Sequence, residues 1–347
     1  MLTVNKIWGC VNLSKKIKSV GIIANPASGR DIRRLVAHGS VFDNAEKVNI
    51  VRRILLALNS LNIDKVHIMP DSYGIGKEAV DGFWGEEKKN FKLDVNILDM
   101  RISGTAEDSF NAAALMEEKD TNIIIVLGGD GTNRVVVKAL DHTPILSLST
   151  GTNNVFPIMA ESTMLGLAAG FFTEFSEEEK EKVTEAIKCI NIFKNDDLED
   201  IALIDAAVVN ESHIGSRALW HTEKLEEIFV TRSTSYDIGM VSIPGCLTEV
   251  KVGDEGGVYL KVGEPNQTVR AAVAPGVIKE IPVEDWRKLK PEEAIELPKK
   301  DRIIALDGER ELFIKEDEKV KIQLSSAGSR FLDYKQALKL ANSKKML

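Results

Sequence analysis

The stretch "IIIVLGGDGTNRVVVKAL", residues 123–140, decides the fold, because a run of branched apolar residues meets a glycine-rich turn within it. The segment "NIIIVL" (122–127) is continuously apolar, as are strands buried on both faces of a parallel sheet. The segment "RVVVKAL" (134–140) predicts a helix despite its valines, because its position after a glycine turn outweighs a weak intrinsic propensity. The stretch therefore predicts a strand, a tight turn and a helix.

The rest of the first half repeats this alternation of strand and helix. Apolar runs predict strands within 18–29 and at 65–70, 94–100 and 144–149. Helical periodicity begins at Asp43 or Asn44, either of which can cap the helix, and again at 105–119, where Thr105 is a cap candidate. Alternating β and α elements predict a doubly wound, mostly parallel sheet.

The pattern of apolar and polar residues changes after about Glu174. A polar helix is predicted at 175–189, and short apolar runs separated by Asn-Asp, Gly and Pro turns follow it, among them "IGMVSIPG" (238–245). These runs predict an antiparallel β-rich domain. The segment "RFLDYKQALKLANSK" (330–344) predicts a closing helix that returns to the first domain.

Two domains follow from this pattern and from the length of 347 residues. The first comprises residues 1–172, with 328–347 packed back on it, and binds nucleotide or phosphate. The second comprises residues 173–327 and binds the acceptor. The overall expectation is an α/β protein with an N-terminal doubly wound sheet and a C-terminal antiparallel β-rich domain.

Composition excludes several classes of protein. A net charge of −8 argues against nucleic acid as the main partner, because phosphate backbones require a basic surface. The three cysteines form no CxxC pair, which indicates neither a zinc site nor a disulfide framework and favours a reducing cytoplasm. No stretch reaches the roughly 20 apolar residues of a membrane helix, so no membrane partner is expected.

The turn GGDGT (128–132) carries the first chemical signal. Ligands of open α/β sheets bind at the carboxyl ends of strands, and helix N-termini favour anions. Glycines allow the backbone to approach a phosphate closely. Asp130 would repel a phosphate unless it accepts a proton or holds Mg²⁺. The alternative is a structural turn in which Asp130 caps the helix.

Two further polar turns follow strands and are expected at the same edge of the sheet. "NPASGRDIRR" (25–34) combines side-chain donors, a glycine and arginines, which are the usual bidentate partners of phosphate. "STGTNNVFP" (149–157) offers groups that can bind a ribose or a phosphate. Each turn taken alone is also compatible with a solvated loop. The candidate nucleotide- or phosphate-binding residues of the three turns are Asn25, Ser28, Gly29, Arg30, Arg33, Gly128, Gly129, Gly131, Thr132, Gly151, Thr152, Asn153 and Asn154.

These three turns resemble the superfamily of NAD kinases, diacylglycerol and sphingosine lipid kinases and phosphofructokinases, whose shared signature is GGDGT. Residues 25–53 closely resemble the ATP-NAD kinase branch of the acetoin-catabolism protein X type. The resemblance implies an ATP-dependent kinase that uses Mg²⁺ with ATP, or polyphosphate as donor. It also implies that Asp130 orients or deprotonates the acceptor hydroxyl. Relatives often form dimers or tetramers, so it implies a homo-oligomer as well.

The second half extends the resemblance. Asn210 and Glu211 match an Asn-Glu pair that holds the acceptor in NAD kinases, and Asp307–Gly308–Glu309 matches a DGE motif assigned to catalysis or metal positioning in lipid kinases. Asp307 and Glu309 are therefore candidate catalytic residues beside Asp130. Taken from the residues alone, Asn-Glu is also compatible with a strand end and Asp-Gly with a turn.

The acceptor is less well indicated by the sequence. NAD kinases carry a Thr-Pro-Thr-Gly-Ser-Thr-Ala-Tyr stretch that lines their NAD site, and the nearest candidate here, "VSIPGCLTE" (241–249), lacks that pattern. We expect NAD or another small hydroxyl compound as the acceptor. The alternatives are a non-catalytic nucleotide-binding regulatory protein on a kinase scaffold, and a lipid kinase of the diacylglycerol type.

Overall fold

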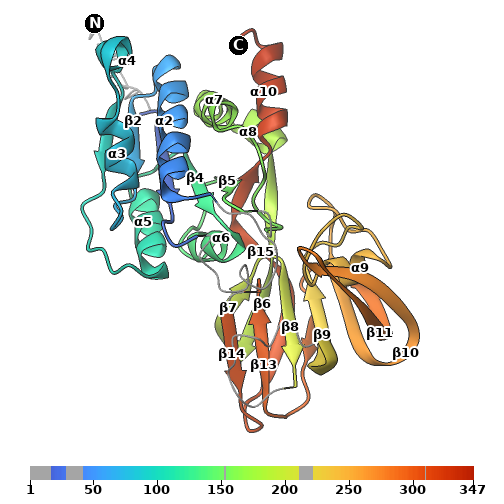
Figure 1. Ribbon diagram of the computed structural model, residues 1–347. Coiled ribbons are helices and arrows are strands. Elements are labelled where there is room, and N and C mark those ends of the chain that lie inside the picture. Colours follow the sequence, from blue (N-terminus) through green and yellow to red (C-terminus); the bar gives the residue numbers. More distant parts are fainter. Residues whose placement is uncertain (1–16, 29–41, 152–153, 211–221, 309) are drawn as a thin grey trace, which may run out of the picture.

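The computed structural model describes residues 17–28, 42–151, 154–210, 222–308 and 310–347. Within these ranges the strands form two sheets, one of nine strands and one of six. Figure 1 shows the first sheet among the helices of the first half, and its last strands continuing into the second half.

The first five strands form a parallel sheet in the order β3-β2-β1-β4-β5. β1, β4 and β5 are buried along their whole length, as expected for strands covered by helices on both faces. The prediction of a doubly wound, mostly parallel sheet is confirmed. The bounds of the five strands are Ser19–Ala24 (β1), Lys65–Ile68 (β2), Asp94–Ile97 (β3), Ile123–Gly128 (β4) and Ile145–Ser149 (β5).

Capping side chains mark the start of α2 and α5 in the first half. Asp43 accepts a hydrogen bond from the Glu46 amide, and Thr105 accepts one from the Glu107 amide, which confirms both cap candidates. The bounds of these helices are Asn44–Ser60 (α2), Ile75–Asp81 (α3), Gly85–Asn90 (α4), Ala106–Glu118 (α5), Asp130–Val137 (α6) and Ser162–Phe172 (α7).

The nine-stranded sheet continues into the second half of the chain. β15 (Val320–Leu332) pairs in parallel with β5 through Phe331 and Ile145, and along its length with β6 (Thr184–Lys194) in antiparallel fashion. β7 (Asp197–Ala202) and β12 (Ala294–Glu296) complete the sheet. The two halves therefore share backbone hydrogen bonds, a feature that the sequence pattern does not predict.

The second sheet is antiparallel and has the order β11-β10-β9-β8-β13-β14, which confirms the predicted β-rich second half. A 3₁₀ turn at Thr222–Lys224 precedes β9. The bounds of the six strands are Asp205–Val209 (β8), Leu225–Val230 (β9), Gly257–Ala274 (β10), Val277–Leu289 (β11), Arg302–Leu306 (β13) and Arg310–Ile314 (β14).

Two predicted elements are wrong. The helix predicted at 175–189 is a short helix, α8 (Glu177–Val183), that begins in a Ser176–Glu179 capping box. From Thr184 the chain is strand β6, because it pairs with β15 and buries Ile187, Cys189 and Ile190. The strand predicted at "IGMVSIPG" contains a helical turn, α9 (Ser242–Gly245), whose start is fixed by the Ser242 hydroxyl donating to the Gly239 carbonyl.

The closing helix α10 (Tyr334–Ser343) is confirmed. Its Ala337 and Ala341 are fully buried in the apolar core of the first half, where α10 packs against α7 (Figure 1). None of the helices in the described ranges is long and apolar enough to cross a membrane.

Candidate nucleotide and acceptor site

The turns that follow β1, β4 and β5 meet at the carboxyl edge of the parallel sheet. The Asn25 side-chain amide donates to Thr132 Oγ1 at 2.9 Å, which joins the first turn to GGDGT. The Ser28 and Thr150 hydroxyls are hydrogen-bonded at 3.0 Å, which joins the first turn to the third. The three predicted turns therefore form one continuous surface.

Two glycines allow this close approach. A Cβ on Gly128 would lie 2.5 Å from Thr132 Cβ, and one on Gly129 would lie 2.8 Å from Asn154 Oδ1. Gly131 is buried within α6, and the Gly151 carbonyl accepts a hydrogen bond from Ser149 Oγ at 2.6 Å. A side chain at 128 would collide with Thr132 of the same turn, and one at 129 would meet the Asn154 side chain of the third turn.

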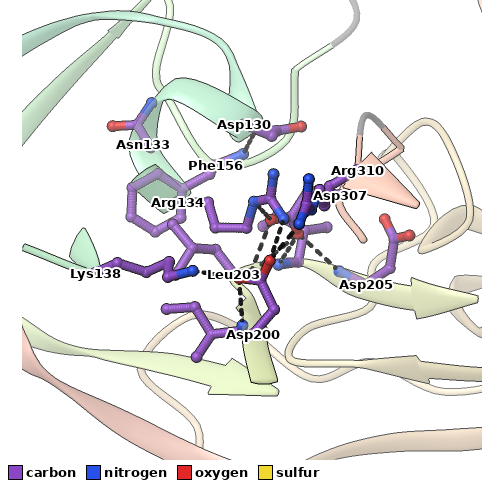
Figure 2. A network of polar contacts seen from close by, with 12 residues as sticks. Asp130, Asn133, Arg134, Lys138, Phe156, Asp200, Leu203, Asp205, Asp307 and Arg310 are labelled. Atoms are coloured by element: carbon purple, nitrogen blue, oxygen red, sulfur yellow. Dashed lines mark hydrogen bonds and ion pairs between the residues drawn. The ribbon is translucent and has the colours of Figure 1, made fainter. Parts of the chain in front are cut away.

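Asp130 is the first residue of α6 and is 7% exposed. Its Oδ1 accepts a hydrogen bond from the Phe156 amide at 2.8 Å, and both carboxylate oxygens lie 3.1 Å from the Val155 amide (Figure 2). The N-cap of α6 is Gly129, so Asp130 does not cap its own helix. Its carboxylate is instead held in one orientation against the end of the third turn.

A buried lysine, which the sequence analysis missed, supports the first turn. Lys47 in α2 is 1% exposed, and its Nζ donates to the carbonyls of Asn25 and Ser28, each at 2.9 Å. Helical periodicity places Lys47 on the same face as Val51 and Ile54. A lysine on an apolar face is the signal that could have found it.

Several predicted site residues cannot be placed. They lie outside the described residues, and their roles remain predictions: Gly29, Arg30, Arg33, Thr152, Asn153, Glu211 and Glu309. Asn210 is described and exposed at the end of β8, where its amide donates to the Lys224 carbonyl at 2.9 Å. It does not line the pocket described below.

Asp307, a predicted catalytic residue, is enclosed in the protein. Its side chain is 0% exposed, and its carboxylate accepts hydrogen bonds from the amides of Leu203 at 3.0 Å and Ile204 at 2.8 Å. Burial raises its pKa to about 6, although Arg134 and the amides oppose that change. The carboxylate therefore faces the protein interior and positions the 203–204 segment, and its catalytic role stays a prediction.

A network of charges joins α6 to the second half. Arg134 lies between Asp307, at 3.6 Å, and Asp200, at 3.8 Å, and Lys138 Nζ lies 2.8 Å from Asp200 (Figure 2). Arg310 of β14 lies 3.5 Å from Asp200. Burial alone would raise the pKa of Asp200, but the Lys138 hydrogen bond, the Ile201 amide and Arg134 lower it. The helix that opens with Asp130 is thus anchored to β7 and to the β13–β14 turn.

A pocket of about 560 Å³ lies between the two halves. Its walls include residues 155–159, the start of β6, Leu203 and Ile204, and the start of α10. Asp130 accepts hydrogen bonds from the 155–156 segment, and Asp307 accepts them from the 203–204 segment. Two buried carboxylates therefore set the positions of two walls of the pocket.

The second half contributes a hydroxyl-rich run that the sequence analysis missed. Thr231 and Arg232 line the pocket, and the Arg232 guanidinium donates to the Val155 carbonyl. They begin "TRSTSY" (231–236), which directly follows β9. The signal was the cluster of hydroxyl residues directly after a strand.

Comparison with known proteins gives a consistent result. Residues 20–174 match the ATP-NAD kinase N-terminal domain, and residues 188–327 match the acetoin catabolism protein X C-terminal domain. A curated acetoin catabolism protein X from Cupriavidus necator is 36% identical over 321 residues, which are 90% of this chain and 89% of that protein. The chain belongs to the acetoin catabolism protein X family. The family resemblance predicted from the sequence is confirmed.

Solved structures are more distantly similar. A putative diacylglycerol kinase from Bacillus anthracis str. Sterne is 14% identical, with a TM-score of 0.49 and coverage of 92% of this chain and 98% of that one. A diacylglycerol kinase from the same organism gives 14% identity and a TM-score of 0.43, with coverage of 91% and 97%. In this member of the acetoin catabolism protein X family, a kinase-type domain carries the three turns, and the family's C-terminal domain supplies Thr231 and Arg232.

Proposed function

We propose that the protein is a phosphotransferase that moves a phosphoryl group from ATP, or from polyphosphate, to a hydroxyl of NAD or a related small molecule. The observation that carries the proposal is the joining of three strand-end turns around the N-terminus of α6. Backbone amides at a helix N-terminus favour phosphate, and Gly128 and Gly129 add no side chain there.

The proposed reaction depends mainly on positioning. The phosphates of ATP would lie against Gly128–Thr132 and the turn at 25–28, and the acceptor would lie in the pocket between the halves. Asp130, whose orientation is fixed by the amides of Val155 and Phe156, would orient the acceptor hydroxyl or take its proton. Phosphoryl transfer requires little more than alignment and neutralisation of charge, so this set of groups suits it.

Mg²⁺ would enter with ATP. Among the residues that the structure describes, no group of three or more His, Cys, Asp or Glu side chains could hold a metal ion. The described side chains therefore fit an ion that is held mainly by phosphate oxygens and water, with at most the Asp130 carboxylate as a protein ligand. This is the usual pattern for Mg²⁺. The ion would neutralise charge on the transferred phosphoryl group.

A second function is favoured by one observation. Asp130 and Asp307 both direct their carboxylates to backbone amides of this chain, as expected if the kinase scaffold has kept its shape for binding alone. The protein would then be a nucleotide-binding regulator without catalysis. ATP binding in the absence of any phosphorylated acceptor would favour this alternative.

The test is an acceptor screen with ATP labelled at the γ-phosphate. The panel contains NAD, nucleosides, sugars, hydroxy acids and diacylglycerol, and Asp130→Asn serves as the blank. Exposed Asp317→Asn is the matched control, since it makes the same chemical change far from the turns. We expect one class of acceptor to become labelled by the wild type and by the control. Labelling of diacylglycerol but not of NAD would favour a lipid kinase instead.

A further inference from the structure

The pocket between the two halves has an apolar side and a charged side. Phe156 and Phe331 pack edge to face on the apolar side, with ring centroids 5.5 Å apart. Glu185, Lys188 and Arg232 stand on the charged side. The hydrogen bonds that these three groups already make decide what a ligand can still offer them.

The three N–H donors of the Lys188 ammonium are all used within the protein. Its Nζ donates to the carbonyls of Lys251 at 3.0 Å, Asp254 at 2.8 Å and Gly256 at 3.0 Å. An ammonium group has three donors, and all three are used to hold the 251–256 loop beside the pocket. Burial lowers the pKa of Lys188 to about 8, so it remains mostly charged at neutral pH. It contributes positive potential to the pocket but no direct contact.

Glu185, by contrast, has unused acceptors. It is half-buried in β6 opposite Phe331 of β15, and within the described residues its carboxylate makes no hydrogen bond or ion pair. The nearby Asp333 carboxylate is already committed, because it caps α10 by accepting from the amides of Lys335 and Gln336. A carboxylate that lines a pocket without a partner is a group that a ligand can satisfy.

Arg232 supplies the complementary donor. Its Nη2 binds the Val155 carbonyl and lies 3.5 Å from Asp237 Oδ1, and its Nε is buried without a hydrogen-bond partner. Thr231 is not available, since its hydroxyl donates to the Leu203 carbonyl at 2.7 Å. The pocket therefore offers the Glu185 carboxylate as acceptor and the Arg232 guanidinium as donor around an apolar body, with the Lys335 ammonium at its α10 end.

The charges decide between two kinds of hydrogen-bond donor. An ammonium ligand at Glu185 would be repelled by the two cations that act on this carboxylate, Lys188 and Arg330, which outnumber the one neighbouring anion, Asp333. A hydroxyl group donates to a carboxylate without meeting that repulsion. Hydroxyls on a neutral or anionic molecule are therefore the donors that suit Glu185.

We propose that Glu185 determines the ligand specificity of this pocket by accepting hydrogen bonds from hydroxyl groups of a neutral or anionic polyhydroxy compound, an acceptor oxygen of which meets Arg232. The inference rests on the proposed function, because the bound compound is the molecule to be phosphorylated. It adds the class of that molecule and the side chain that selects it.

The first test measures binding by calorimetry. The probes are adenosine, NAD and glucose, each beside a deoxy analogue, with 3′-amino-3′-deoxyadenosine and glucosamine as the ammonium analogues. At least one hydroxyl compound should bind the wild type, and its deoxy and ammonium analogues should bind more weakly. Glu185→Gln should weaken binding about 10- to 100-fold, the loss of one hydrogen bond to a charged group. ATP binding should stay unchanged in the variant.

The second test needs no ligand. Burial and Asp333 raise the pKa of Glu185, whereas Lys188 and Arg330 oppose the rise, so the charged form costs stability in the folded protein above its ordinary pKa of 4.5. Glu185→Gln should therefore raise the melting temperature at pH 7. Below pH 4.5 the carboxyl is protonated in both states, and the gain should disappear. Exposed Glu249→Gln is the matched control and should change neither binding nor melting.

Three results would overturn the inference: tighter binding of an ammonium analogue, equal binding by Glu185→Gln, or saturable binding by none of the probes. A lower melting temperature of Glu185→Gln at pH 7 would do so as well, since it would reveal a structural partner. If the proposed function fails instead, the experiments give a different result. In that case the hydroxyl compound binds and depends on Glu185, but no labelled phosphate reaches it.

Discussion

At the scale of single residues, two Asp-Gly pairs that look alike in the sequence have different environments. Asp130 and Asp307 each accept hydrogen bonds from backbone amides of a neighbouring turn. Asp130 stands at the edge where the three turns meet, as the first residue of α6, whereas Asp307 is enclosed, with φ of 49° and 0% side-chain exposure. The environment, and not the motif, distinguishes a carboxylate at the turn edge from one that positions a wall of the pocket.

The burial of Asp307 predicts a pH dependence of stability. Its pKa is about 6 in the folded protein and ordinarily 3.8, so the folded state keeps the proton to higher pH. Its contribution to the unfolding free energy therefore falls as pH rises from about 4 to 6, by up to about 3 kcal/mol, and is constant above. Urea unfolding of the wild type and Asp307→Asn across pH 4–8 measures the difference. A contribution that increases with pH would contradict this account.

Substitution of Gly129 is expected to weaken nucleotide binding specifically. Gly129→Ala would place a Cβ 2.8 Å from Asn154 Oδ1, so the Asn154 side chain, which donates to Ser149 Oγ and to the Gly151 carbonyl, must shift. We expect weaker ATP binding with little change in melting temperature, because the strain falls on a turn at the edge of the sheet. Calorimetry with ATP measures it. Gly253→Ala, whose nearest neighbour would be Glu185 Oε1 at 3.4 Å, is the control that should leave ATP binding intact.

At the scale of elements, the side chains of α2 and α6 hold the turns of the site in place. α2 supplies Lys47 to the carbonyls of the first turn, and α6 supplies Asp130 to the third turn and Arg134 to the second half. Each helix thus links its own packing to the shape of a turn. Changes on these helices are expected to reach the site without contact with a ligand.

Lys47→Met tests this link. The variant keeps the buried stem but leaves the carbonyls of Asn25 and Ser28 without their donor, which should cost about 2–3 kcal/mol. ATP affinity should fall with stability, because the first turn loses its support. Arg52→Met, on the same helix but half exposed, is the control and should change ATP affinity little. Unchanged unfolding and ATP binding in Lys47→Met would contradict the role assigned to Lys47.

The same elements show what the sequence could predict. Periodicity and capping residues locate α2 and α5 because their signals are local. The helix predicted at 175–189 fails beyond Val183 because pairing with β15, which is more than a hundred residues away, overrides local propensity. The three turns were predictable from glycines after strands. Lys47, Glu185 and Arg232 were not recognised, because their roles depend on contacts between distant segments.

At the scale of the whole molecule, the two halves are joined by strands and by the last helix. β5, β15 and β6 are neighbours in one sheet, and α10 buries Ala337 and Ala341 in the core of the first half. The pocket lies at this junction. The alignment of the halves and the shape of the pocket are therefore set together.

Overpacking α10 tests this dependence. Ala337→Leu adds bulk at a fully buried position against the first half and should lower the unfolding free energy by about 1–3 kcal/mol. Hydrogen exchange should show the loss in α7 as well as in α10, because the two helices are packed together. Lys339→Leu on the exposed face of α10 is the control. Equal protection of α7 in both variants would argue against the closing role of α10.

The central claim is that the edge built around Asp130 transfers a phosphoryl group. Its most direct test is the single-turnover rate of transfer from saturating labelled ATP to the acceptor found by the screen, in the wild type and in Asp130→Asn. We predict that the variant binds ATP as the wild type does and transfers phosphate at least about 100-fold more slowly. Equal rates in the two proteins, or bound ATP with no transfer by the wild type, would contradict the claim.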